Sequence, residues 1–197
     1  MKKSSLFVSA ALMLFTGLAS AHGPVRGKLT ATLSIDAPAA KVWDVIKNYN
    51  DMSWHPMIKS VDGGDNNKGS VRTLHLQSGG TIKEELKSHE DAKMAYKYKI
   101  VDMSSTGTIK HAGQDEEIPV LPVGNYAAEL SVSDKGGKAE VEWVATYYRA
   151  YVNNNPPAEL NEEAADKAVT EVLSSGLEAL SRKLTGHAGK VEIDMKR

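Results

Sequence analysis

A long amphipathic segment near the C-terminus constrains the fold more than any other feature of this sequence. Residues 159–184 carry an apolar stripe at helical spacing, and a helix of about 26 residues is nearly 40 Å long. The stripe consists of Leu160, Ala164, Val169, Val172, Leu173, Gly176, Leu177, Leu180 and Leu184. A helix of this length needs an apolar partner surface of similar extent, so the rest of the chain must supply one.

The preceding residues predict an antiparallel sheet as that partner. Residues 29–35 alternate apolar and polar, and two hairpins are expected: residues 70–77 with 81–89, and residues 126–133 with 138–148. Ser78-Gly79-Gly80 and residues 134–137 provide their turns. Residues 93–101 alternate as well, whereas residues 102–124 read as a long polar loop. Local hairpins favour antiparallel pairing.

Two shorter features follow the first strand. Asp36-Ala37-Pro38 resembles a helix start, with Asp36 near the cap, and apolar residues from Val42 to Tyr49 continue at helical spacing. The segment Trp54-His55-Pro56 is expected in a short second helix or a turn. The predicted class is therefore α+β with a helix-grip fold: a curved antiparallel sheet wrapped around the long C-terminal helix, with an internal cavity. Small residues on that helix indicate either close packing, which we favour, or unfilled space.

The first residues predict export. Lys2 and Lys3 precede a short apolar run and the sequence Ala19-Ser20-Ala21, so residues 1–21 resemble a cleaved secretory signal. An uncleaved anchor is the alternative, but the run is short for a membrane span. Residues 22–197 are expected to form one domain in a bacterial periplasm. The chain has no cysteine, which excludes disulfides, thiolate metal sites and cysteine catalysis.

Charge excludes one class of partner. The formal charge is −1 for the whole chain and falls to −3 without Lys2 and Lys3, so there is no strong positive field for nucleic acid.

The first hairpin places two charges on the inner face of the sheet. Gln77 is expected opposite Thr81 across a three-residue loop, which sets Leu74 opposite Glu84 and Arg72 diagonal to Glu84. An unpaired buried charge is costly, so we predict that Arg72 and Glu84 pair with each other or reach water in a cavity. The remaining strands add polar aromatic side chains to the same face, and the candidate ligand contacts among them are Tyr96, Tyr98, Tyr126 and Trp143. A satisfied polar core and a ligand cavity both explain these residues.

Several segments resemble the START-like, polyketide cyclase/dehydrase (SRPBCC) superfamily. They are IDAPAAKVW at 35–43, Trp54-His55-Pro56, GGTIKEEL at 79–86, LPVGNY at 121–126 and EVEW at 140–143. HGP at 22–24, YRAY at 148–151 and NNPP at 154–157 are most similar to MxaD-type periplasmic proteins. The superfamily resemblance implies a helix-grip fold with a deep cavity. The MxaD-type resemblance implies an accessory factor that assists electron transfer from methanol dehydrogenase to its cytochrome c.

The residue patterns leave three functions open. Besides the accessory role, the chain could carry a small hydrophobic or amphipathic molecule, or act as a cyclase- or hydrolase-like enzyme with Glu84 or His55 as base. No nucleophile elbow or metalloprotease helix is present, so we assign no catalytic residue and no cofactor. We predict instead that Trp54 caps the cavity and that His55 forms hydrogen bonds at its rim.

Two further features are candidates for other kinds of binding. His22 would be the N-terminal residue after cleavage, and a free amine with an imidazole can chelate copper. The acids Asp115, Glu116 and Glu117 could form a docking patch for a basic partner, although a solvated surface is the ordinary explanation of such a run.

Overall fold

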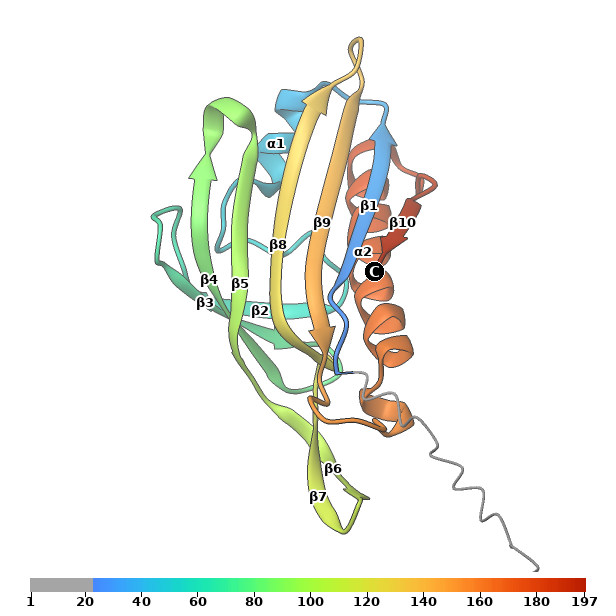
Figure 1. The fold of residues 1–197 in the computed structure, drawn as a ribbon. Coiled ribbons are helices and arrows are strands. Elements are labelled where there is room, and N and C mark those ends of the chain that lie inside the picture. The colour runs from blue at the N-terminus through green and yellow to red at the C-terminus, as the bar shows by residue number, and fades with distance from the viewer. Residues whose placement is uncertain (1–22) are drawn as a thin grey trace, which may run out of the picture.

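A computed structural model describes residues 23–197, and its main body is one curved antiparallel sheet (Figure 1). Eight strands lie in the order β10-β1-β9-β8-β5-β4-β3-β2. Their bounds are β1 (Gly27–Ile35), β2 (Ile58–Gly63), β3 (Val71–Leu76), β4 (Thr81–Glu90), β5 (Ala95–Met103), β8 (Val123–Asp134), β9 (Ala139–Arg149) and β10 (Glu192–Lys196). A separate two-stranded sheet consists of β6 (Ser105–His111) and β7 (Gln114–Pro119).

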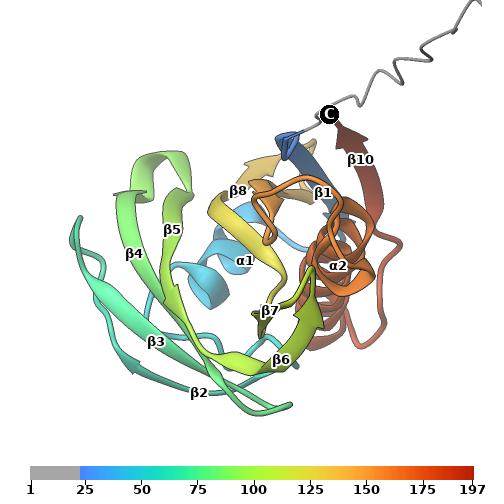
Figure 2. The ribbon, with the colours of Figure 1, turned by 60° about the horizontal axis from the view of Figure 1, so that its bottom comes forward.

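The long helix α2 (Glu162–Thr185) lies within the curve of the sheet (Figure 2). It packs on β1 and β9. Its buried residues are Ala165, Val169, Leu173, Gly176, Leu177, Leu180 and Ser181. The helix begins three residues later than predicted because Ala158–Leu160 forms a 3-10 turn and the side chain of Asn161 then caps the N-terminus by accepting from the Ala164 N–H. The helix-grip prediction is confirmed.

The short helix α1 (Ala39–Ile46) differs from the prediction at both ends. Pro38 occupies the cap position without a side-chain hydrogen bond, so Asp36 does not cap the helix. The helix ends at Ile46, and Tyr49 lies in the loop that follows it. Trp54-His55-Pro56 forms turns rather than a second helix.

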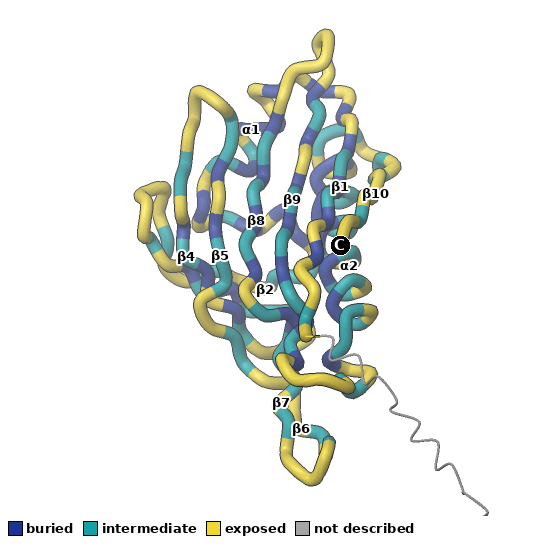
Figure 3. The backbone as a smooth tube through the Cα atoms, viewed as in Figure 1, coloured by how far each residue is buried: buried dark blue, intermediate teal, exposed yellow. Residues whose placement is uncertain are grey.

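The prediction of a long loop at residues 102–124 is wrong. Most of this segment forms the β6–β7 hairpin, which projects from one end of the sheet (Figure 1). Its turn uses Ala112 and Gly113, both at positive φ. The hairpin was missed because its strands have few apolar residues, and most of its side chains are exposed (Figure 3).

The register of the β3–β4 hairpin is shifted by two residues from the predicted one. His75 pairs with Thr81, and Arg72 lies directly opposite Glu84 rather than diagonal to it. The loop is longer than expected because Gly79 and Gly80 both adopt positive φ, and the Leu76 N–H donates to the Gly80 carbonyl at 3.1 Å. A shift of two keeps the same faces inward, so the prediction that Arg72 and Glu84 face the interior holds.

Both edge strands were also missed. β2 is mostly exposed and lacks a regular apolar alternation, whereas β10 alternates Ile193 and Met195 with charged residues but is only five residues long and mostly exposed. The inner residues of the central strands alternate as predicted (Figure 3), with Tyr96 and Tyr98 on β5, Leu130 on β8 and Trp143 on β9 all buried. Within residues 23–197, no helix is both long and apolar enough to span a membrane. His22 and the predicted signal at residues 1–21 lie outside the described residues.

Candidate functional site: an interior cavity with a buried ion pair

A cavity of about 350 Å³ lies between the sheet, α2 and the loop that follows α1. Most of its wall is apolar, formed by Met52, Pro56, Met57, Ile58, Leu74, Leu76, Ile82, Ile100, Val120, Leu121, Ala168 and Val172. Of the eight predicted ligand contacts, six line it: His55, Arg72, Glu84, Tyr98, Tyr126 and Trp143. Trp54 and Tyr96 are absent from the wall. The apolar lining was missed by sequence reasoning because loops and strands distant in the chain supply it.

Arg72 and Glu84 are the buried charged residues of the wall, and Glu171 on α2 is an exposed one. Directly opposed on β3 and β4, Arg72 and Glu84 are 1% and 5% exposed. Arg72 Nε donates to Glu84 Oε2 at 2.7 Å, and a second guanidinium nitrogen, NH2, lies 2.6 Å from the same oxygen. The predicted pairing is therefore present, and neither charge is left alone in the interior.

The remaining contacts of Arg72 hold its guanidinium in place. NH1 donates to the backbone carbonyl of Tyr49, and the guanidinium carbon lies 4.0 Å from the centre of the Tyr49 ring. The Tyr98 ring centre is 5.3 Å away. Burial disfavours the charge and is the largest single influence, but the attraction of Glu84 together with that of the surrounding tyrosines raises the pKa of Arg72. Arg72 thus remains charged, and each of its three guanidinium nitrogens has an acceptor.

At Glu84, the effect of burial on the pKa outweighs that of the neighbouring charge. Burial raises the pKa of its carboxyl, while the neighbouring guanidinium limits the rise. Both Arg72 contacts go to Oε2. No side chain or backbone N–H within residues 23–197 donates to Oε1, although the residue lines the cavity. A carboxylate has more acceptor positions than Arg72 uses, so Glu84 can accept a further hydrogen bond from the cavity side.

His55 has a structural role rather than that of a free base. Its Nδ1 accepts from the Met57 N–H at 3.2 Å, and its Nε2 lies 3.0 Å from the Val172 carbonyl. A carbonyl only accepts, so Nε2 must carry the proton and the ring must be neutral. Burial lowers the pKa of His55 to about 4, which fits this tautomer. Both nitrogens are occupied, so proton abstraction by His55 would break an existing hydrogen bond.

Trp54 packs against aromatic residues of the site but does not line the cavity. Its ring packs on His55 and on Trp143, with centroids 5.6 Å and 5.8 Å apart. The small residue Gly176 on α2 faces the same cluster, since a Cβ added there would lie 2.6 Å from Cδ2 of His55. Close packing therefore explains Gly176, whereas Ala168 borders the cavity. Small residues on α2 therefore have both predicted roles: Gly176 allows close packing, and Ala168 leaves space at the cavity.

The tyrosines form a connected polar layer. The Trp143 indole N–H donates to the Tyr98 hydroxyl at 3.0 Å. The Tyr98 hydroxyl in turn contributes a hydrogen bond that partly offsets the rise in the pKa of Tyr126, which burial causes. Tyr96 lies deeper, stacked on His89, and burial raises its pKa to about 12. The polar core and the cavity wall are thus parts of one layer.

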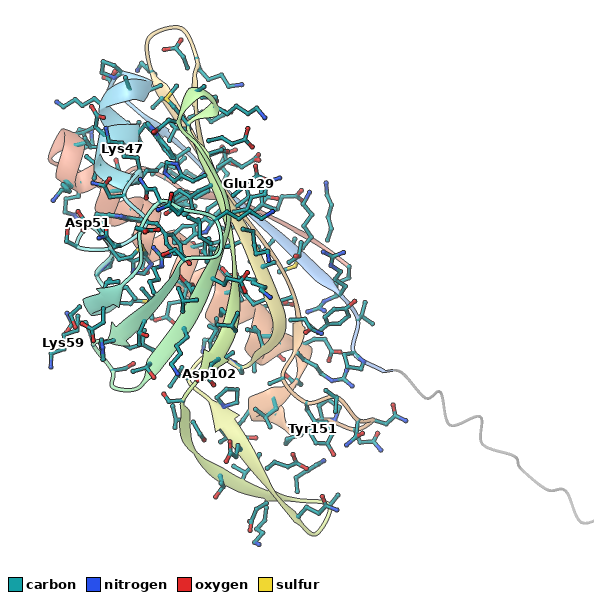
Figure 4. The ribbon with its side chains drawn as sticks, turned by 90° about the vertical axis from the view of Figure 1, so that its left-hand side faces the viewer. Lys47, Asp51, Lys59, Asp102, Glu129 and Tyr151 are labelled. Atoms are coloured by element: carbon teal, nitrogen blue, oxygen red, sulfur yellow. The ribbon has the colours of Figure 1, made fainter. Side chains whose placement is uncertain are left out.

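The three acids Asp115, Glu116 and Glu117 lie away from the cavity on β7. Asp115 pairs with Lys110 across the hairpin at 2.7 Å. The hairpin also contacts the loop after β9, since His111 Nε2 lies 2.8 Å from the Asn155 carbonyl and the His111 ring lies 5.2 Å from the ring of Tyr151. Figure 4 labels Tyr151 on this loop. Within residues 23–197, no three His, Asp or Glu side chains are grouped as a metal site would require.

Comparison with known proteins decides the family. Residues 26–185 match the family described as polyketide cyclase / dehydrase and lipid transport. The chain belongs to this family. The matched range extends from β1 to the end of α2, so it contains every element that forms the cavity. No curated protein matches.

Solved structures with a similar fold are consistent with the family assignment. The protein XoxI from Bacillus cereus is 25% identical, with a TM-score of 0.61 over 79% of this chain and 94% of that one. Ara h 8.0201 is 14% identical, with a TM-score of 0.60 over 83% and 100%. Norcoclaurine synthase from Thalictrum flavum, solved with dopamine and hydroxybenzaldehyde, is 14% identical, with a TM-score of 0.58 over 93% and 100%. The last two likenesses concern the fold alone.

Proposed function

We propose that this protein binds a small, largely apolar molecule in the cavity between the sheet and α2. The observation that carries the proposal is the cavity itself, about 350 Å³ in volume, with a mainly apolar wall interrupted by a few polar residues, namely Arg72, Gln77, Ser78, Glu84, Tyr98, Tyr126 and Glu171. Binding sites for small molecules commonly have this combination of size, apolar lining and few polar groups. The family description, which includes lipid transport, supports the same function.

Filling the cavity should weaken this binding. Ala168 borders the cavity on α2, so Ala168→Phe should weaken binding of the neutral fluorescent probe N-phenyl-1-naphthylamine by roughly tenfold or more, since the ring would occupy its space. Fluorescence titration measures the affinity. Ala179→Phe is the matched control, because Ala179 lies on the same helix outside the cavity wall.

Wild-type affinity in the control and weakened binding in Ala168→Phe would support the cavity site, provided that circular dichroism shows both variants folded. Equal affinity in all three proteins would place the probe elsewhere and contradict the proposal.

As a second candidate, we propose that the protein is a periplasmic accessory factor of methanol oxidation, docking through the β6–β7 hairpin onto methanol dehydrogenase or its cytochrome c. Two observations support it. The segments at 148–151 and 154–157 resemble MxaD-type proteins, and the hairpin projects beyond the sheet with Asp115, Glu116 and Glu117 on one strand (Figure 1). Acids on a projecting element suit association with a basic partner.

Neutralising the three acids tests this docking. The variant Asp115→Asn/Glu116→Gln/Glu117→Gln should slow association with the dehydrogenase or the cytochrome severalfold at low salt, because electrostatic attraction acts mainly on the association rate. Biolayer interferometry at two salt concentrations measures it. The matched control is Asp36→Asn/Asp134→Asn/Glu140→Gln, at the opposite end of the sheet. Equal association rates for both variants and wild type would contradict docking through the hairpin.

A further inference from the structure

The charged wall of the cavity offers little to an anionic ligand. Arg72 is the only cation in the wall among the described residues, and its contacts are already made to Glu84 Oε2 and to the Tyr49 carbonyl. A bound carboxylate would have to share the guanidinium with these two acceptors. It would also meet the negative charges of Glu84 and of Glu171 at the α2 side of the wall.

One carboxylate oxygen of Glu84, in contrast, has no hydrogen-bond donor among the described residues. Its Oε1 receives no hydrogen bond within residues 23–197, while Oε2 takes both Arg72 contacts. A buried carboxylate is poorly solvated, so each missing hydrogen bond is costly, and a bond to a charged acceptor is stronger than one between neutral groups. Burial raises the pKa of Glu84, because its charged form is poorly solvated in the interior.

A ligand with a positively charged group would fit beside Glu84 less well than a ligand with an uncharged hydrogen-bond donor. Arg72 already balances the charge of Glu84, and desolvating a further ammonium group beside this pair would be expensive. Tyr98 and Tyr126 line the same cavity, and the Tyr98 hydroxyl already accepts from the Trp143 indole. A neutral hydroxyl can donate to Glu84 and accept from a tyrosine.

We infer that the cavity selects an uncharged, mainly apolar molecule with a hydroxyl or similar donor at one end, which donates to Oε1 of Glu84, and that it discriminates against carboxylates of the same size. This inference names the ligand class of the proposed binding function and rests on that function.

Three probes of nearly equal size separate these properties: 2-naphthalenemethanol, 2-ethylnaphthalene and 2-naphthoate. Isothermal titration calorimetry on the wild-type protein should give the tightest binding for the alcohol. The expected advantage is about tenfold over the hydrocarbon and more over the carboxylate, because a hydrogen bond to a charged group contributes this much.

The double variant Arg72→Met/Glu84→Leu removes both charges while keeping an apolar wall of similar volume. In it, the alcohol should bind no more tightly than 2-ethylnaphthalene. If this variant does not fold, Glu84→Gln gives a second readout, since an amide N–H₂ turned to the cavity would favour the carboxylate over the alcohol.

The outcomes separate the inference from the function on which it rests. Equal affinities for the three wild-type titrations, or tightest binding of 2-naphthoate, would overturn the donor preference while leaving cavity binding intact. An advantage of the alcohol that persists in Arg72→Met/Glu84→Leu would also overturn it. Absence of binding by all three probes would contradict the binding function and the inference with it.

Discussion

Replacing Arg72 alone with methionine is expected to lower the free energy of unfolding by about 3 to 5 kcal/mol. The change leaves the Glu84 carboxylate buried without its partner, and it also removes the donor to the Tyr49 carbonyl. Urea denaturation monitored by circular dichroism measures the loss at neutral pH, where an unpaired carboxylate would be most costly.

The double variant Arg72→Met/Glu84→Leu is the matched control for that loss. Replacing a buried ion pair by apolar side chains is often neutral or stabilising, so we expect the double variant to recover most of the stability. A double variant as unstable as Arg72→Met would show that the cost comes from lost packing on Tyr49 and Tyr98 rather than from the stranded charge.

Acid is expected to destabilise the protein through His55. The pKa of His55 is about 4 in the folded protein, against 6.5 for an ordinary histidine. Between these values the unfolded chain binds a proton that the native protein does not, so stability is fully present above pH 6.5 and is lost as the pH falls towards 4. The contribution of His55 between about pH 7 and pH 4.5 is about 2 kcal/mol.

Comparison of wild type with His55→Gln isolates this contribution. The introduced glutamine cannot titrate, yet its amide can still donate to the Val172 carbonyl. The urea midpoint should therefore fall less in the variant than in wild type when the pH is lowered from about 7 to about 4.5. Glu84 has a raised pKa and changes stability in the opposite direction over this range, but it does so in both proteins. The same loss in both would contradict a buried neutral His55.

Local patterns were sufficient for the class of fold and for the identity of the inner face. Alternation on β5, β8 and β9 predicted which side chains are buried, because the two faces of a strand differ in solvation and the period of two cannot change along it. The same argument placed Arg72 and Glu84 inside even though their register was wrong by two residues. β2 and the β6–β7 hairpin gave no such signal, because few of their residues are apolar and many are exposed. β10 does alternate, but over only five residues.

Only the tertiary structure determined what the interior polar residues do. Trp54-His55-Pro56 was recognisable as a unit, but the tautomer of His55 depends on Val172, 117 residues away on α2, and burial in the folded protein keeps its ring neutral. The cavity wall likewise combines side chains from β3, β4, the loop after α1 and α2. The sequence by itself determined a sheet, its inner face and a covering helix, because solvation acts residue by residue along the chain. The partners, the register and the volume left between the layers depend on how those elements meet in space, which no local pattern records.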